Sequence, residues 1–247
     1  MVRPDGRKPD EMRSIRITPG FIKTAAGSAL IEFGNTRVIC TAMMDEKVPP
    51  FLKDSGRGWL TAEYAMLPAS TPERKVRDGI RQDGRSTEIQ RLIGRSLRSI
   101  MDFSALGERT IYIDCDVLEA DGGTRTAAIS GAFIALVFAV DKLIGRKLIS
   151  CSPLRSYVAA ASVGLIGGRA CLDLCYEEDS GAEADMNVVM TDAFEMIEVQ
   201  GTGEKRPFTR AEMEKLLKLA DKGILEVIGT QKTVLGDLGT LVGGSRE

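Results

Sequence analysis

The chain has 247 residues, of which 43% are hydrophobic and 28% charged, and its formal net charge is −2. This length fits one large domain or two modest ones, with enough apolar material for a core without disulfides or a structural metal. Histidine is absent, which excludes Ser-His-Asp and Cys-His nucleophile systems, HExxH zinc sites and any imidazole acid or base. Chemistry must therefore use carboxylates, Arg or Lys, backbone amides, or a metal held by oxygen ligands.

The composition also bears on the compartment. No apolar run approaches the ~20 residues of a membrane helix, and the polar start of the chain does not resemble a secretory signal. The five cysteines are odd in number and lack the spacing of a zinc knuckle. Most lie in apolar runs, so we expect buried packing residues, with Cys171 and Cys175 on one face of a strand. These features predict a soluble, cytoplasmic protein with no membrane contact.

In the first half of the chain, several predicted strands are followed by one helix. Residues 28–33 and 36–42 predict a β-hairpin that turns at Gly34-Asn35, and residues 59–67 a further strand of an antiparallel region. Residues 68–84 are polar and basic and predict a long exposed loop. A helix should follow, opened by a capping box of Thr87 and Gln90, with Glu88 placed to pair with Arg91 or Arg95.

The second half repeats this order. We expect a strand over residues 109–118, a long apolar helix over 127–144, a strand pair within 157–176 and a hairpin of 187–191 with 196–200. An amphipathic helix over 209–228 should close the chain, opened by a capping box of Thr209 and Glu212. Strand-rich segments followed by helices thus occur twice. This order predicts an α+β fold of two β-then-α halves in one domain, residues 1–235, with a flexible tail over 236–247.

Charge is distributed unevenly along the chain. Eight basic and three acidic residues lie between Arg74 and Arg98, whereas nine acidic residues and no basic one lie between Ala170 and Glu198. This segregation can form a phosphate-attracting surface beside a cation-attracting one. The alternative is a pair of solvated faces on opposite sides of the molecule.

The sharpest local motif is DGGTRT at residues 121–126. Two glycines between a strand and a helix let the backbone approach a ligand, and the helix start offers free N–H groups and a positive dipole end. Thr124 and Arg125 add donors suited to phosphate. The motif lacks the Gly-Lys-Ser/Thr of a Walker loop, so it predicts a single phosphate site, the alternative being an ordinary tight turn.

The acidic segment supplies a second candidate site. Asp179 and Asp185 lie on either side of a glycine-containing turn, so both carboxylates can face one pocket. Oxygen ligands of this kind suit Mg²⁺ or Mn²⁺; the alternative is a solvated acidic hairpin. A phosphate cradle, a metal site and a basic loop are the components needed to transfer a phosphodiester to orthophosphate. That nucleophile is already anionic, so no histidine is required.

Several longer motifs carry a family resemblance. They are DGR (5–7), GWLTAEY (58–64), GRSTEIQRLIGRSLR (84–98), DCDVLEADGGTRT (114–126), DMNVVMT (185–191) and QGT (200–202). In their order and spacing they resemble the ribonuclease PH family of phosphorolytic 3′ exoribonucleases, across the chain to about residue 235. The resemblance implies a ribosomal-protein-like β-α-β-α fold and a homo-hexameric ring, a trimer of dimers.

The same resemblance implies roles for individual residues. Phosphate, the co-substrate, would be bound by Arg85, Thr124 and Arg125, with Gly123 lining the approach. Asp179 and Asp185 would bind Mg²⁺ (or Mn²⁺) or assist the departing 3′-hydroxyl, so that the catalytic set is Arg85, Arg125, Asp179 and Asp185. The substrates would be the 3′ tails of precursor tRNA, and the products nucleoside diphosphates.

One departure from the family pattern concerns RNA binding. The basic loop of the family often begins with arginine where this chain has Ala69, whereas Arg74 and Arg77 match later basic positions. We therefore expect Arg74 and Arg77 to bind RNA with a weaker grip on its backbone, or with a different balance of contacts. Two alternatives are a non-catalytic, RNA-threading ring subunit of an exosome-like assembly and a small-molecule kinase. The retained phosphate-site residues argue against the first, and the missing triphosphate loop against the second.

Overall fold

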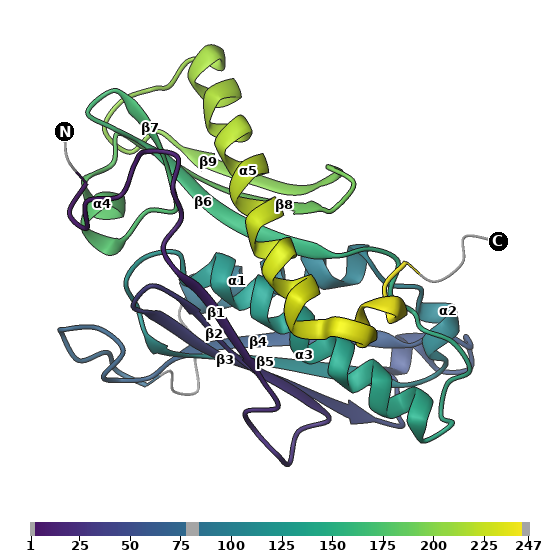
Figure 1. Ribbon diagram of the computed structural model, residues 1–247. Helices are drawn as coiled ribbons and strands as arrows, with labels where there is room; N and C mark the ends of the chain where they lie inside the picture. Colours follow the sequence, from purple (N-terminus) through teal and green to yellow (C-terminus); the bar gives the residue numbers. More distant parts are fainter. Residues whose placement is uncertain (1–2, 78–83, 244–247) are drawn as a thin grey trace.

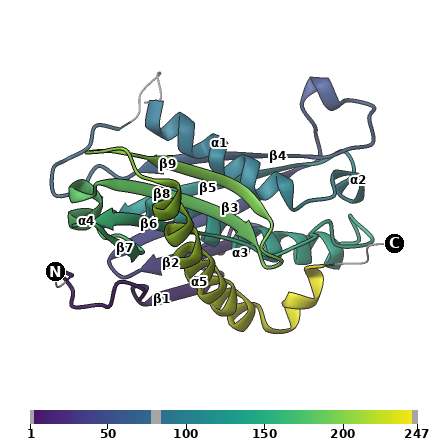
Figure 2. The same ribbon diagram turned by 90° about the horizontal axis from the view of Figure 1, so that it is seen from above.

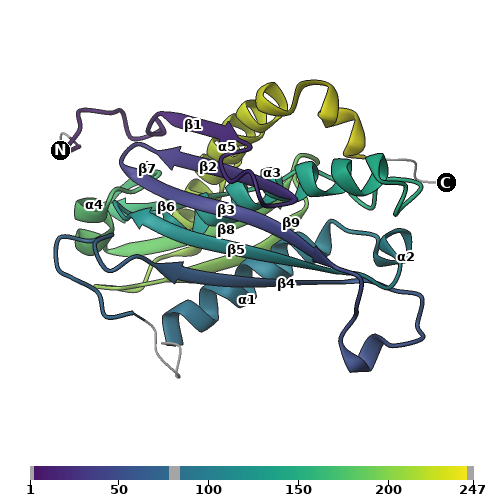
Figure 3. The same cartoon turned by 90° about the horizontal axis from the view of Figure 1, so that it is seen from below.

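The computed structural model describes residues 3–77 and 84–243. Its first half is a five-stranded sheet with the order β1-β2-β3-β5-β4. The strands are β1 (Ile15–Pro19), β2 (Gly27–Phe33), β3 (Thr36–Asp45), β4 (Trp59–Met66) and β5 (Thr110–Glu119). The predicted hairpin is confirmed, because β2 and β3 pair antiparallel from Phe33 and Thr36 outward. Figure 3 shows this sheet from its open side.

Strand β4 differs from the expected antiparallel arrangement. It pairs parallel with β5, from Trp59 beside Thr110 to Met66 beside Val117. A parallel neighbour requires a long crossover, which here consists of the segment after Met66 and the helix α1 (Gly84–Ser99). The crossover places the start of α1 near the same end of the sheet at which β5 ends.

Two helices line the inner face of this sheet. Helix α3 (Thr124–Gly145) packs against β2 and β3 on one side and β6 on the other, and α1 packs against β4 and α3. Both therefore lie between the two sheets, as Figure 1 shows. The short helices η1 (Pro50–Leu52) and α2 (Phe103–Leu106) lie in the connections of this half.

Helix α3 is long and apolar enough to cross a membrane by length and composition, contrary to the expectation that no such run exists. In the fold, however, 78% of its apolar stretch is buried, between residues of both sheets. A helix that is apolar all round is typical of a protein core. We therefore interpret α3 as the central core helix.

The second half is a four-stranded antiparallel sheet with the order β7-β6-β8-β9. Its elements are β6 (Val158–Ile166), β7 (Arg169–Leu172), α4 (Tyr176–Gly181), β8 (Ala184–Thr191), β9 (Met196–Thr202) and α5 (Arg210–Leu235). Helix α5 begins with the predicted capping box of Thr209 and Glu212 and packs along β6 and β7 (Figure 2). The two β-then-α halves predicted from the sequence are thus confirmed.

Two local predictions are wrong. The described part of α1 begins at Gly84, so Thr87 lies inside the helix rather than at its cap. Glu88 contacts Arg125, while Arg95 pairs with Glu198 of β9. Each pairing is made between elements distant in sequence, which helical spacing alone does not reveal.

The cysteines and the tail also differ in part from expectation. Strand β7 ends at Leu172, so Cys171 and Cys175 do not share a strand, although both are buried. Cys151 is the exposed one of the five free thiols. The expected flexible tail begins instead with a 3-10 helix, η2 (Gly236–Leu241), which packs against α3 and α5. The domain limit at residue 235 stays a prediction.

Candidate active site

The glycine turn of residues 121–123 joins β5 to α3. Gly122 and Gly123 have φ values of 73° and 65°, a left-handed conformation that glycine adopts without strain. The Thr36 hydroxyl donates to Gly122 O (2.6 Å) and accepts from Asp121 N (2.9 Å). The turn is thereby held on β3, and α3 begins at Thr124, three residues earlier than expected. A helix start leaves first-turn N–H groups without intrahelical partners, which favours an anion here.

Thr124 is buried at this helix start and is held by a tyrosine from β4. Tyr64 donates a hydrogen bond of 2.8 Å to Thr124 Oγ1. Burial raises the pKa of Tyr64, and the contact with Thr124 and the positive charges of Arg85 and Arg125 oppose that rise. Both arginines therefore act electrostatically on the same point, although they come from α1 and α3.

Arg125 extends from α3 between α1 and β9. Its Nη1 lies 3.4 Å from Glu88 Oε1 and 3.3 Å from Gln200 Oε1, and its side chain is 19% exposed. Gln200 in turn donates to Glu198, the partner of Arg95. A chain of polar contacts thus orients the guanidinium from the second half of the molecule.

The two candidate carboxylates lie on α4 and β8. Burial raises the pKa of Asp179, and the charges of Arg85 and Arg125 oppose this. Burial also raises the pKa of Asp185, and the negative charges of Asp179 and Glu204 add to it. The side chain of Asp179 is exposed, so solvent screens its charge. The pKa of the half-buried Asp185 is therefore the more strongly affected by neighbouring groups.

Asp185 also carries an orphaned atom. Its Oδ1 is buried and has no hydrogen-bond partner, which is rare because buried polar atoms are nearly always satisfied. No cluster of three or more acidic or cysteine side chains suited to a metal occurs among the described residues. Mg²⁺ is commonly bound by one or two carboxylates, waters and substrate phosphates. A pair of carboxylates with a free buried oxygen fits such an ion.

The predicted site residues therefore meet at one end of the molecule. Arg85 is exposed in the first turn of α1, and its charge acts on Tyr64 and Asp179. Arg125 acts on Tyr64 and on both carboxylates. The fold thus assembles groups from four elements, α1, α3, α4 and β8, and their roles stay predictions.

The basic loop begins beside this site. Arg74 and Arg77 are exposed in the segment between β4 and α1. The base of the segment is fixed next to the glycine turn, because Ala120 N donates to Ser70 O (2.8 Å). Arg81, which also belongs to the basic run, lies outside the described residues. RNA binding by Arg74 and Arg77 stays a prediction.

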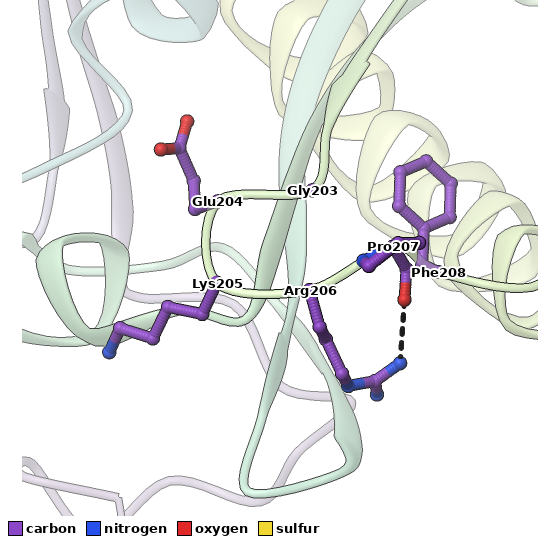
Figure 4. A pocket seen from close by; sticks show the side chains of 6 residues that line it. All are labelled: Gly203, Glu204, Lys205, Arg206, Pro207 and Phe208. Carbon is purple, nitrogen blue, oxygen red and sulfur yellow. Dashed lines mark hydrogen bonds between the residues drawn. The ribbon is translucent and has the colours of Figure 1, made fainter.

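Sequence reasoning missed several residues of the site. Tyr64 and Gln200 lie in recognised motifs, but the motifs do not indicate that Tyr64 contacts Thr124 or that Gln200 contacts Arg125. Glu204 follows β9 in a loop that lines a pocket of about 460 Å³, and it projects from the loop opposite the Arg206 guanidinium (Figure 4). The only sequence signal for Glu204 was its place just after the QGT motif.

Known proteins match both halves of the chain. The model of the 3′ exoribonuclease family, domain 1, matches residues 11–140, and that of domain 2 matches residues 156–223. Ribonuclease PH of Syntrophomonas wolfei is 57% identical over 238 residues, which cover 96% of this chain and 100% of the relative.

Solved structures share the fold. Rrp46 of rice (Oryza sativa) has a TM-score of 0.77 at 19% identity, covering 94% of this chain and 100% of that chain. The Archaeoglobus fulgidus exosome with RNA bound to the active site has a TM-score of 0.80 at 22% identity, and the match covers 92% of this chain and 91% of that chain. The sequence matches confirm a phosphorolytic exoribonuclease, a nucleotidyltransferase, and do not favour a non-catalytic exosome-like subunit. The chain belongs to the ribonuclease PH family of 3′ exoribonucleases.

Proposed function

We propose that this exoribonuclease trims the 3′ tails of precursor tRNA, with inorganic phosphate bound at the start of α3. The observation that carries the proposal is the meeting of this helix start, with Thr124 and Arg125, and the carboxylates of Asp179 and Asp185. Arg85 and Arg125 supply positive charge, Thr124 a hydroxyl, and Gly123 the close backbone approach. Such groups position an anionic nucleophile and offset charge in the transition state.

The reaction follows from these positions. A phosphate oxygen attacks the phosphorus of the last phosphodiester, the bond to the 3′ oxygen of the penultimate nucleotide breaks, and a nucleoside diphosphate leaves. The departing 3′ oxygen acquires a proton. Asp185, whose pKa is raised by burial and neighbouring carboxylates, is suited to hold a proton near that oxygen.

Asp179 and Asp185 would also hold Mg²⁺ (or Mn²⁺). Such an ion supplies charge neutralisation for the phosphate oxygens. We expect EDTA to abolish activity and added Mg²⁺ to restore it. The affinity of the purified protein for Mn²⁺, measured by electron paramagnetic resonance, should be at least tenfold lower in Asp185→Asn. Unchanged Mn²⁺ binding in that variant would remove Asp185 from the metal site.

The partners and compartment belong to the same proposal. RNA would reach the site over Arg74 and Arg77, and the subunits would form a homo-hexamer, a trimer of dimers. The family relationship and the fold shared with exosome subunits support a ring. Light scattering should then give about six times the chain mass of 26.7 kDa. Five free thiols support a reducing, cytoplasmic location.

The decisive experiment supplies a 3′-extended precursor tRNA with Mg²⁺, with and without orthophosphate, and identifies the released nucleotides. We expect diphosphates only when phosphate is present, and their loss in Arg125→Ala. The matched control is Arg210→Ala, since Arg210 is a surface arginine of α5, 93% exposed in its side chain. Monophosphates released without phosphate would show hydrolysis and contradict the proposed phosphate site.

A further inference from the structure

A buried ion pair connects the N-terminal segment to the loop before α4. Asp173 accepts three hydrogen bonds from Arg13, from its backbone N (2.8 Å), Nε (2.9 Å) and Nη2 (2.7 Å). Both side chains are almost fully buried, at 5% and 1% exposure. Asp173 also has a φ of 53°, an uncommon conformation for a residue other than glycine. Surrounding contacts must maintain this geometry; of the hydrogen bonds that the Asp173 carboxylate accepts from the described residues, Arg13 donates three and Arg7 one.

The same guanidinium reaches the glycine turn. Arg13 Nη1 donates to the carbonyl of Asp121, and Nη2 lies 3.4 Å from the carbonyls of both Gly122 and Leu174. The glycine turn and the segment of residues 173–174 form a junction, and Arg13 contacts the backbone on both sides of it. The glycine turn leads into Thr124 and Arg125, and residues 173–174 lead into α4 with Asp179.

The two sides also touch directly. A Cβ at Gly122 would lie 2.7 Å from the carbonyl carbon of Cys175 and 2.9 Å from Tyr176 N, closer than real Cβ atoms approach. Tyr176 N, at the start of α4, donates to Asp121 Oδ1 (3.1 Å). The turn and α4 thus pack backbone against backbone, and a shift of one displaces the other.

A second ion pair on the N-terminal segment provides a comparison. Arg3 donates to both carboxylate oxygens of Glu178 on α4, at 2.6 and 2.7 Å. It also donates to Asp173 O (2.8 Å). Among the described residues, the hydrogen bonds of Arg3 go to α4, to Asp173 and to the N-terminal segment, and none goes to the glycine turn. Figure 1 shows this segment running beside α4.

We propose that Arg13, through Asp173 and the carbonyls of the glycine turn, is a positioning residue that sets the phosphate site of the first half against Asp179 of the second. The inference rests on the proposed function. Thr124 and Arg125 follow Gly123 directly, and Asp179 lies within α4, so the junction determines the separation between phosphate and the carboxylates. Misplacement of reacting groups by about 1 Å can cost on the order of a hundredfold in rate.

The test compares Arg13→Lys with Arg3→Lys. Both substitutions keep the charge and disturb a buried ion pair of the same segment, but only the first removes contacts to the glycine turn. For Arg13→Lys we expect the KM for phosphate to rise at least tenfold. Saturating phosphate should restore part of the rate, and the affinity for an oligoribonucleotide without phosphate should stay within twofold of wild type. For Arg3→Lys we expect a KM for phosphate within about twofold of wild type.

The outcomes separate the inference from the proposed function. A wild-type enzyme that needs no phosphate contradicts the proposed function itself. Circular dichroism gives the folded fraction of each variant, to which the rates are normalised. If wild type needs phosphate and both variants raise the KM for phosphate equally, Arg13 is only structural and the inference is wrong. Should Arg13→Lys fail to fold, Asp121→Ala removes the contact to Tyr176 without burying a charge. That variant should also raise the KM for phosphate, by at least threefold, and an unchanged KM would overturn the inference.

Discussion

Tyr64 of β4 and Thr124 of α3 share a buried hydrogen bond of 2.8 Å that joins an edge strand to the proposed phosphate site. The tyrosine hydroxyl determines the direction in which the threonine hydroxyl can donate. Because Thr124 accepts from Tyr64, its own proton is available to a ligand at the helix start. A residue in the middle of a strand thus acts on the first residue of a helix 60 positions later.

Tyr64→Phe should weaken phosphate use without preventing folding. A single neutral hydrogen bond contributes about 1 kcal/mol, which corresponds to roughly a fivefold change. We expect kcat/KM for phosphate to fall by about that factor, measured by release of nucleoside diphosphate. Tyr112→Phe is the control, because Tyr112 is exposed on the outer face of the sheet. Equal effects of both substitutions would contradict the role of Tyr64.

Glu88→Gln should improve phosphate binding slightly. Glu88 is 47% exposed and contacts Arg125 at 3.4 Å, so its charge partly neutralises the arginine that would bind phosphate. An exposed ion pair contributes roughly 0–1 kcal/mol, so we expect the KM for phosphate to fall by about twofold at low salt. Glu214→Gln, which alters the surface pair with Arg210, should leave KM unchanged. A rise in KM after Glu88→Gln would show that Glu88 instead orients Arg125.

The double variant Arg74→Ala, Arg77→Ala should reduce the salt dependence of RNA binding. Each phosphate contact on a single strand contributes about 0.7 to the slope of log K against log salt. Losing both arginines should therefore lower the slope by up to about 1.4 for a long 3′ tail. The control replaces Lys215 and Lys218, which are exposed on α5. An unchanged slope would show that RNA does not pass over the loop.

Asp114→Asn should stabilise the protein above the titration range of this residue. Burial raises the pKa of Asp114, and the charges of Glu63 and Asp116 add to it. Between the ordinary value of 3.8 and the raised value the folded state binds more protons, so wild-type stability falls as pH rises through this window. Asparagine removes that loss, and the variant should have the higher Tm at pH 7.

The same variant should lose its advantage as the pH falls below 3.8, where both the folded and the unfolded states of wild type become protonated. Asp10→Asn gives the opposite sign, because a hydrogen bond from Lys222 lowers the pKa of Asp10. Thermal melts of the three proteins between pH 3 and pH 8 check both signs. A Tm for Asp114→Asn equal to that of wild type at pH 7 would show that solvent screens these charges fully, and a lower Tm would show that the hydrogen bond with Thr41 outweighs them.

Local patterns in the sequence were sufficient for several elements. The hairpin of β2 and β3, the capping box of Thr209 and Glu212, and the glycine turn before α3 were all predicted, because each depends on residues close in sequence. The start of α1 and the short helix α4 were missed. At α4 the capping groups depend on tertiary contacts, because Glu178 binds both Arg3 and the N–H of Cys175.

The sequence by itself determined the chemistry available to this protein. Without histidine the reaction relies on carboxylates, arginines and helix-start amides, and the spacing of the motifs indicated the family. Only the tertiary structure decided which side chains act on one another. Tyr64 and Thr124 are 60 residues apart, Arg125 and Gln200 are 75 apart, and Arg13 and Asp173 are 160 apart. Contacts over such distances depend on how the two sheets pack around α3, and no local pattern encodes that packing.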